Sequence, residues 1–534
     1  MQNIKTELEI KKLYEDFAIA NKINNDNFFK IIKDNKDTKY GKANDFEHIN
    51  SIEDYVSKIP LTDYSNYRDR IDNASDYTAY PVYDMLITSG STGKQKIFPI
   101  TTEALKRYSS IIVDYPNYIN NVSTKAIHVS VFRKSNKENN LLSALYYGWL
   151  KDKELVDFDN YVGGKELLFS NVGGIKLFSN NNIDNVPYLK TWLMFSYPEL
   201  SSIQSIYLYD ILMLCKWIEQ NWKTVLNDIK NKKISIDLSD DVKTILLNTL
   251  PNEEFINRIE NELSKGFDKP FLPRLYKKIK YISGIGGNLY SVQEKQLKKY
   301  IGEIPKYEFA YALSECIVGV ALEMDKAEYA LLPNNAYYEF CSKETEQIIS
   351  LKELQIGKTY ELILTTFSGL YRYRTGDLLK ITRVEGETPI FEIVGKKEQV
   401  INIAGEKIDS AIAVEAVNSV ATKYQLNVHD FAFGINTKIT PFGYHIFIEN
   451  DKTIRDNKIN DDLDEILCKL SADYKDLRML GLLSSPEVHF IDCGLIQKSL
   501  NEEKKLRHNK PQIFLNEYRT NYLLKEQKNE FIKK

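Results

Sequence analysis

Residues 85–96 read Met85-Leu86-Ile87-Thr88-Ser89-Gly90-Ser91-Thr92-Gly93-Lys94-Gln95-Lys96, an apolar strand followed by a loop of small, hydroxylated and cationic residues. Glycines let the backbone approach a ligand closely, successive N–H groups form a concavity for anions, and hydroxyl and lysine side chains add donors and charge. The loop is not the usual P-loop, because that pattern requires a glycine in place of Thr88 and a serine or threonine in place of Gln95. We predict that it binds phosphate; the alternative is a plain Gly/Ser turn between a strand and a helix.

Length and periodicity indicate the fold class. The chain has 534 residues, more than one hydrophobic core usually serves, so we expect two or three domains. Segments of helical periodicity mix with short β-branched runs, which is typical of the α/β class. One such run, residues 125–132, alternates apolar and polar side chains as a half-buried strand does.

Charge and composition exclude several kinds of partner. Lysine plus arginine number 71 against 74 acidic residues, a formal net charge of -3, so no basic field would attract nucleic acid or an anionic membrane. Residues 1–7 lack an apolar signal core and no apolar run approaches the ~20 residues that span a bilayer, so we expect a cytoplasmic protein. Five scattered cysteines and six histidines without an HExxH-like spacing predict reduced thiols and no metal site made of protein ligands alone.

Two later segments place glycines or polar side chains after predicted strands. The strand from Lys280 runs into the glycine-rich loop 284–288, ahead of a helix-like stretch, Ser291 to Tyr300. Leu289 takes the last glycine position of the dinucleotide pattern, so a ligand-lining loop and a simple turn remain equal alternatives. The strand over residues 307–313 leads into Ser314 and Glu315, where an open α/β sheet presents ligands. Glu315 is a candidate Mg²⁺ ligand, and an exposed surface glutamate is the alternative.

Two further segments contain candidate ligand residues and a candidate domain boundary. In residues 364–377, Asp377 after a glycine turn could accept two hydrogen bonds from a ribose diol, and Arg374 could hold a phosphate; the alternative is a strand pair with a Gly-Asp turn and surface arginines. In residues 391–407, a polar break from Gly395 to Gln399 separates two strands. It predicts a domain boundary followed by a hairpin tip, or an ordinary inter-strand turn.

Taken in order, these segments resemble the adenylate-forming superfamily of acyl-CoA synthetases, peptide-synthetase adenylation domains and luciferases. Within it, the chain is most similar to the Gretchen Hagen family of acyl-acid amido synthetases. The resemblance rests on Thr88–Gly93, Tyr311–Cys316, Leu332–Phe340 and Tyr371–Asp377, with further likeness in Asp37–Lys42, Ile59–Tyr64 and His508–Gln512.

The resemblance implies a large nucleotide- and acid-binding domain, residues 1–395, and a smaller, mobile α+β domain, residues 396–534. It implies a catalytic lysine in the small domain, with Lys510 and Lys407 as candidates, and a hinge at Glu398. It implies Mg²⁺ at Glu315, ribose at Asp377, and a nucleotide site completed by Ser89, Gly90, Ser91, Thr92, Tyr311, Ser314 and Tyr337. Two departures, Gln512 and Lys396 in place of the usual arginines, bear on the small domain.

The implied activity is that of a ligase that uses ATP and Mg²⁺ to convert a small carboxylic acid into an acyl-adenylate and then transfers the acyl group to an amine such as an amino acid. One alternative is transfer to a thiol, on coenzyme A or a carrier protein. A non-catalytic nucleotide-binding protein is the alternative of another class. The acid pocket is expected among the helix from Thr102, the strand near His128 and the loop from Ser283 to Asn288.

Overall fold

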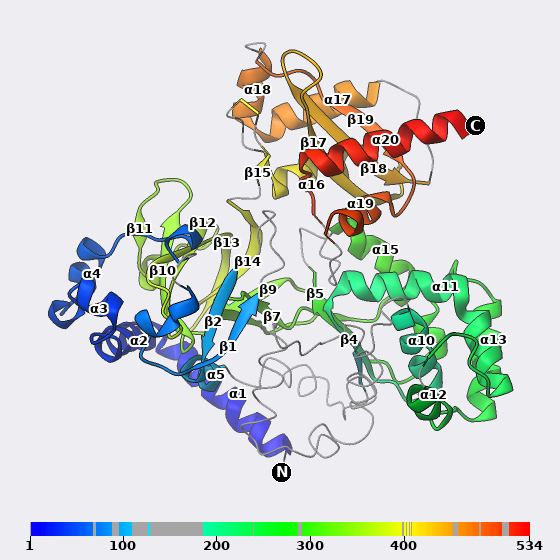
Figure 1. Ribbon diagram of the computed structural model, residues 1–534, viewed down its shortest axis with the longest axis horizontal. Helices are drawn as coiled ribbons and strands as arrows, with labels where there is room; N and C mark the ends of the chain where they lie inside the picture. Colours follow the sequence, from blue (N-terminus) through cyan, green and yellow to red (C-terminus); the bar gives the residue numbers. More distant parts are fainter. Residues whose placement is uncertain are drawn as a thin grey trace. The chain divides into compact units, whose positions relative to one another are not determined.

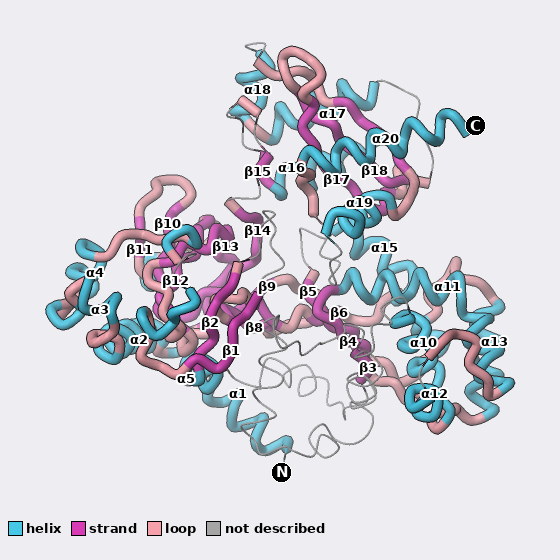
Figure 2. Tube along the Cα trace, in the orientation of Figure 1, coloured by secondary structure: helices cyan, strands magenta, loops and turns pink. Residues whose placement is uncertain are grey.

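The computed structural model describes residues 2–67, 71–87, 96–108, 126–128, 185–238, 240–286, 291–397, 400–401, 403–404, 406, 408–451, 458–479, 482–504 and 512–533 (Figure 1). The chain divides into two compact units. The first contains Met1–Ile285, Leu297–Thr375 and Leu379–Ile393; the second contains Gly286–Gln296, Gly376–Leu378 and Val394–Lys534. Both units combine helices with strands, which confirms the α/β class (Figure 2). The division after residue 395 stays a prediction.

An eight-stranded sheet forms one centre of the first unit. Its order is β11-β10-β12-β13-β14-β9-β8-β7, and β10 pairs antiparallel with β11 and β12, as β8 does with β7 and β9. The strands are β7 (Ala310–Ala312), β8 (Ile317–Ala321), β9 (Glu328–Leu331), β10 (Ala336–Ser342), β11 (Ile348–Ile349), β12 (Thr359–Thr366), β13 (Tyr373–Glu385) and β14 (Thr388–Lys396).

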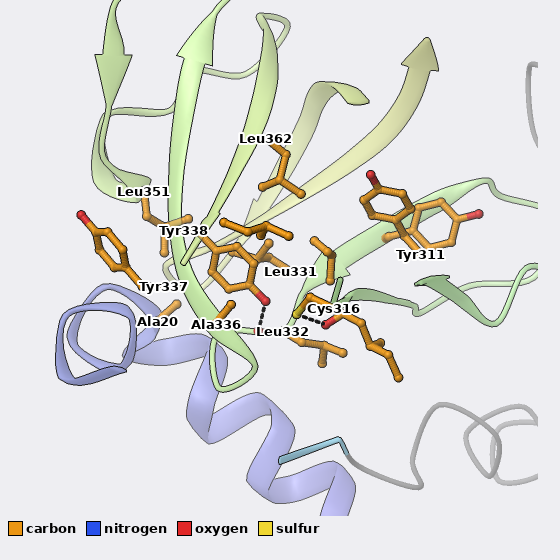
Figure 3. Packing of buried hydrophobic residues seen from close by; sticks show 14 of the residues in the cluster. Ala20, Tyr311, Cys316, Leu331, Leu332, Ala336, Tyr337, Tyr338, Leu351 and Leu362 are labelled. Carbon is orange, nitrogen blue, oxygen red and sulfur yellow. Dashed lines mark hydrogen bonds between the residues drawn. The ribbon is translucent and has the colours of Figure 1, made fainter. Parts of the chain in front are cut away.

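Helix α2 (Ala20–Asp34) packs on this sheet because its apolar residues fall on one face. Phe28, Ile31 and Ile32 follow helical spacing and are buried. Two buried amides fix the helix to β10: Asn24 donates to the Tyr338 carbonyl at 3.1 Å, and Asn27 donates to the Ala336 carbonyl at 3.0 Å. Figure 3 shows the core beneath it, in which the Tyr338 hydroxyl donates to the Leu332 carbonyl.

A four-stranded parallel sheet forms the second centre of this unit. It consists of β3 (Ala126–His128), β4 (Ser202–Tyr207), β5 (Tyr281–Ile285) and β6 (Lys306–Tyr307), in that order. Its strands contribute Ile203 and Ile282 to a core that they share with helices α10 (Val186–Ser196), α11 (Leu208–Asn231), α13 (Glu253–Ser264) and α15 (Ser291–Ile301). The strand expected after Lys280 and the helix from Ser291 are therefore confirmed. Of the strand expected over residues 125–132, the described residues 126–128 form β3, and the others lie outside the described residues.

The predicted phosphate loop lies between the strands of a hairpin. Strand β1 (Val82–Ile87) pairs antiparallel with β2 (Ile97–Thr101), and Ile87 is opposite Ile97. Helix α5 (Thr102–Arg107) begins only after β2, so the alternative of a turn leading directly into a helix is wrong. The remaining helices of this unit are α1 (Gln2–Ala18), α3 (Lys39–Ala43), α4 (Ile52–Lys58), α12 (Asp240–Leu247) and α14 (Leu272–Leu275).

The second unit has a three-stranded sheet with helices on both faces. Its order is β17 (Val428–Asn436), β18 (Gly443–Asn450) and β19 (Glu487–Ile491), with β17 antiparallel and β19 parallel to β18. Alternate residues face opposite sides. One set lies in a core with α16 (Ser410–Tyr424) and α17 (Lys458–Leu470), and the other packs with α19 (Leu495–Lys504) and α20 (Glu517–Lys533).

The predicted hairpin after the polar break is also confirmed, as β15 (Val400–Ile401) pairs antiparallel with β16 (Ile408–Asp409). Helix α18 (Ala472–Met479) completes the second unit. Among the described helices, none is both long enough and apolar enough to cross a membrane.

Candidate active site

The candidate magnesium ligand stands at the tip of a tight hairpin. Ser314 and Glu315 are the two central residues of the turn between β7 and β8, because the Leu313 N–H donates to the Cys316 carbonyl (2.9 Å) and the Cys316 N–H donates to the Leu313 carbonyl (3.2 Å). Both tip residues are half-buried. A carboxylate held on such a turn fits Mg²⁺, which takes one or two carboxylates and fills its other positions with water and phosphate oxygens.

The strand leading to this tip differs from the sequence expectation. Residues 307–313 were expected to form one strand that ends in Ser314 and Glu315 at the carboxyl edge of a sheet. Instead, β6 ends at Tyr307 in the parallel sheet, and β7 begins at Ala310 in the antiparallel sheet. The expectation is wrong because a two-residue turn sends the chain straight back along β8.

The side chains of Tyr311 and Cys316, behind the tip, are buried. Tyr311 packs its ring against Tyr329 and Phe391, at centroid distances of 6.1 and 5.8 Å. Burial raises the pKa of the Cys316 thiol to about 12. This cysteine therefore stays protonated at neutral pH and is a packing residue, not a nucleophile.

The candidate ribose ligand, Asp377, lies within a strand and beside a lysine. It is buried in β13, and its Oδ1 is 3.5 Å from the Nζ of Lys396. Gly376 before it adopts φ +77°, a conformation that favours glycine. The expected Gly-Asp turn is wrong, since the turn between β12 and β13 is made earlier, with Gly369 at φ +90°. Lys396, in place of the superfamily's arginine, thus supplies a cation to the same carboxylate.

The two arginines of residues 371–377 are engaged by glutamates. Arg374 forms a two-point ion pair with the buried Glu361 of β12, with Nε to Oε1 at 3.0 Å and Nη2 to Oε2. The Arg374 guanidinium therefore binds the Glu361 carboxylate of the same sheet. The sequence had suggested a phosphate as its partner. Arg372 pairs with Glu339 of β10 at 3.0 Å, with both side chains almost fully buried.

The Arg372–Glu339 pair joins three of the segments that carry the family resemblance. The Arg372 guanidinium also donates to the Ile59 carbonyl at 2.8 Å, and Thr62 forms a parallel bridge with Tyr373. Burial raises the pKa of the Glu339 carboxyl, and the nearby guanidinium partly offsets that effect. No motif could identify this pair in advance, because each residue reads separately as a surface charge.

Tyr337, the candidate adenine neighbour, lies in the core. Figure 3 shows it among the buried hydrophobic residues of that core. It is 2% exposed, and its ring is 5.1 Å from that of Phe28 and 6.4 Å from that of Tyr55. These two ring contacts are with α2 and α4. A role beside adenine stays a prediction.

The remaining site candidates lie outside the described residues, and the structure describes only their flanks. They are Ser89, Gly90, Ser91, Thr92, Glu398, Lys407 and Lys510. Beside the phosphate loop, the Ile97 N–H donates to the Tyr64 hydroxyl at 2.8 Å, which ties the hairpin to residues 59–64. Next to Lys407, the buried Glu406 accepts hydrogen bonds from the N–H groups of Ile403 and Ala404, both at 2.8 Å. After Lys510, Gln512 accepts from Arg519 at 2.9 Å.

A row of polar residues crosses the parallel sheet near the expected acid pocket. His128 of β3 is in register with Gln204 of β4, which is in register with Ser283 of β5. Gln204 is buried and donates to the Tyr281 hydroxyl at 3.1 Å. Sequence reasoning found His128 and the Ser283 loop but missed Gln204. Its signal was an amide side chain in the middle of the short strand Ser202–Tyr207, directly after Ile203.

Comparisons with known proteins find matches along most of the chain. Three family models match in order: the GH3 family N-terminal domain over residues 9–306, its central domain over 329–396 and its C-terminal domain over 411–519. The indole-3-acetic acid-amido synthetase GH3.17 of Arabidopsis thaliana is 25% identical over 521 residues, covering 85% of each chain.

Solved structures share the fold. The acyl acid amido synthetase GH3.15 of Arabidopsis thaliana, in complex with 2,4-DB, matches with a TM-score of 0.81 at 22% identity, covering 96% of this chain and 95% of the other. A 2-hydroxyisobutyryl-CoA ligase in the postadenylation state matches with a TM-score of 0.54 at 11% identity, covering 96% and 92%.

Proposed function

The chain belongs to the GH3 family, whose three domains it matches in order, and from this membership we propose that it joins a small carboxylic acid to an amino acid by way of an acyl-adenylate. It is an ATP-dependent adenylate-forming ligase of the acid-amido synthetase kind. The ordered match of all three domains is the observation that carries the proposal. Relatives named for indole-3-acetic acid make aromatic acetic acids the first acids to test.

The first half-reaction requires negative charge to be offset. A carboxylate is a poor acyl donor, and its attack on the α-phosphate of ATP brings two anions together, so donors and cations must stabilise the transition state. Pyrophosphate leaves, and the acid is held as a mixed anhydride with adenosine monophosphate. The amine of the acceptor then attacks the acyl carbon and loses a proton, a C–N bond forms, and adenosine monophosphate departs.

We assign the phosphates to the loop that contains Ser89, Gly90, Ser91 and Thr92. Asp377 accepts hydrogen bonds from the ribose, and the neighbouring Lys396 offsets its charge. Tyr311, Ser314 and Tyr337 complete the nucleotide side. Glu315 would hold Mg²⁺, which when bound neutralises phosphate charge. Lys510 or Lys407 would supply the remaining cation.

The acid would contact the polar row of the parallel sheet. Gln204 and Ser283 are buried polar residues next to each other across β4 and β5. Open α/β sheets present such groups to ligands at the carboxyl ends of parallel strands. Together with α5, they are the proposed lining of the acid pocket.

The two half-reactions need different side chains near the acyl carbon of the acid. We therefore propose that the part of the chain beyond about Gly395 moves between the first half-reaction and the second. Its polar break from Gly395 to Gln399 supports this proposal. A cytoplasmic location stays a prediction.

Pyrophosphate release with ATP, Mg²⁺ and a panel of aryl, indolyl and fatty acids tests the function, followed by mass spectrometry with pooled amino acids, coenzyme A and hydroxylamine. We expect acid-dependent release and an amide with an amino acid. A thioester product would assign the chain to the thiol-acceptor alternative. An adenylate trapped only by hydroxylamine would point to an acceptor absent from the pool, such as a carrier protein. Nucleotide binding without release for any acid would favour a non-catalytic protein.

A further inference from the structure

Three potential metal ligands meet on neighbouring strands of the second unit. His445 lies in β18, and Glu487 and His489 lie in β19. The parallel register sets His445 opposite Glu487 and Phe447 opposite His489. Because alternate residues of a strand share a face, all three side chains leave the same face of the sheet.

The three ligand atoms are spaced for one ion. His445 Nδ1 is 2.8 Å from His489 Nε2 and 3.3 Å from Glu487 Oε2, and His489 Nε2 is 3.7 Å from the same oxygen. Bonds of about 2.0–2.1 Å to a tetrahedral ion place its ligand atoms about 3.3 Å apart. The three separations lie on both sides of that value, so small adjustments bring all three atoms to an ion between them.

The surroundings hold the imidazoles in place and leave one side open. The side chains of His445 and His489 are 6% and 7% exposed, whereas that of Glu487 is 53% exposed. The Phe447 ring stacks on His489, with centroids 5.1 Å apart. Asn436 donates to Glu487 Oε2 at 3.4 Å.

We propose that His445, Glu487 and His489 form a binding site for a zinc-class transition-metal ion in the C-terminal domain. Two imidazoles and one carboxylate are donors for Zn²⁺ or Co²⁺, whereas Mg²⁺ and Ca²⁺ prefer all-oxygen ligands. Three protein ligands leave a fourth position for water on the exposed side. The ion would tie the edge strand β19 to β18 and is separate from the Mg²⁺ assigned to Glu315.

A second cluster in the same unit serves as an internal comparison. His429, Asp451 and Cys493 also bring ligand atoms together. There His429 Nε2 is 2.5 Å from Asp451 Oδ1, and both Asp451 and Cys493 are exposed. The cluster at His445 has two buried imidazoles, so it is the one we expect to bind.

Chelator-treated full-length protein would be titrated with Zn²⁺ by calorimetry and with Co²⁺ by visible absorption, without nucleotide. We expect one ion per chain, the absorption of four-coordinate Co²⁺ and a rise in Tm. Loss of an outer partner typically weakens metal sites about 10- to 100-fold, so Glu487→Gln, which removes a ligand, should weaken binding by more than about 100-fold. Since Glu487 is exposed, the metal-free variant should keep the parent's circular dichroism and Tm.

Cys493→Ser and Glu315→Gln are the matched controls and should bind like the parent. His489→Asn should lose the Co²⁺ absorption as well. Binding that is absent in the parent would overturn the proposal. So would binding that survives Glu487→Gln, or binding that is lost in Cys493→Ser or Glu315→Gln.

Discussion

Two carboxylates supply the negative charges of the proposed nucleotide site. Glu315 stands on a hairpin tip, and Asp377 lies beside Lys396. We expect Glu315→Gln and Asp377→Asn each to lower acid-dependent pyrophosphate release about 100- to 1,000-fold, because each removes a preorganised charge from the transition state. Glu344→Gln, an exposed carboxylate in another turn of the same sheet, is the control. Unchanged release in either variant would remove that residue from the site.

The buried ion pair supports the site without forming part of it. Arg372→Met leaves the Glu339 carboxylate buried with its cationic partner removed, so we expect the free energy of unfolding to fall by about 3–5 kcal/mol. Adding Glu339→Gln should recover part of that loss, since the buried charge is then removed. Urea unfolding of the two single variants and the double variant measures the coupling. Strictly additive losses would contradict a direct interaction.

At the level of elements, the packing of α20 on β17 depends on a glycine. A Cβ on Gly434 would lie 2.4 Å from Thr520 Oγ1 and 2.8 Å from its Cγ2. Gly434→Ala should therefore shift α20 and destabilise the second unit by about 1–3 kcal/mol. Thr520→Gly in the same chain removes both clashing atoms and should restore part of the packing, apart from the helix propensity lost to glycine. Denaturant unfolding checks both; equal losses with and without Thr520→Gly would contradict the packing model.

Local sequence patterns predicted where helices and strands form better than they predicted which sheet or side chain each one contacts. Strands β1 and β5, helix α15 and the β15–β16 hairpin follow from periodicity and turn residues, because these signals lie within a few positions. The split of residues 307–313 between two sheets did not follow, since nothing local specifies which sheet a short strand joins. Likewise, Arg374 read as a phosphate ligand because Glu361 is 13 positions away and is brought near only by strand pairing.

At the level of the whole molecule, the proposed domain movement needs a backbone that can rotate near Glu398. Proline fixes φ near −65° and lacks an N–H, so Glu398→Pro should restrict the chain there. We expect amide formation to fall at least about 10-fold, with acid-dependent pyrophosphate release retained. Glu398→Ala is the matched control and should retain both. Equal loss of both half-reactions in the proline variant would argue against a hinge, as would unchanged small-angle scattering when the adenylate is trapped in the parent.

The contact between the N-terminal segment and Tyr371, just before β13, constrains how the chain folds during its synthesis. Thr62 donates to the carbonyl of Tyr371, 309 positions later, and Tyr371 stacks on Tyr40 with centroids 4.6 Å apart. At about 5–20 residues per second, a ribosome needs roughly 15 to 60 s to supply the second half of this contact after the first has emerged. During that interval, the tyrosines of the N-terminal segment lack their packing partners. The nascent chain therefore presents aromatic surface to chaperones, and slower translation between residues 62 and 371 should lengthen that exposure.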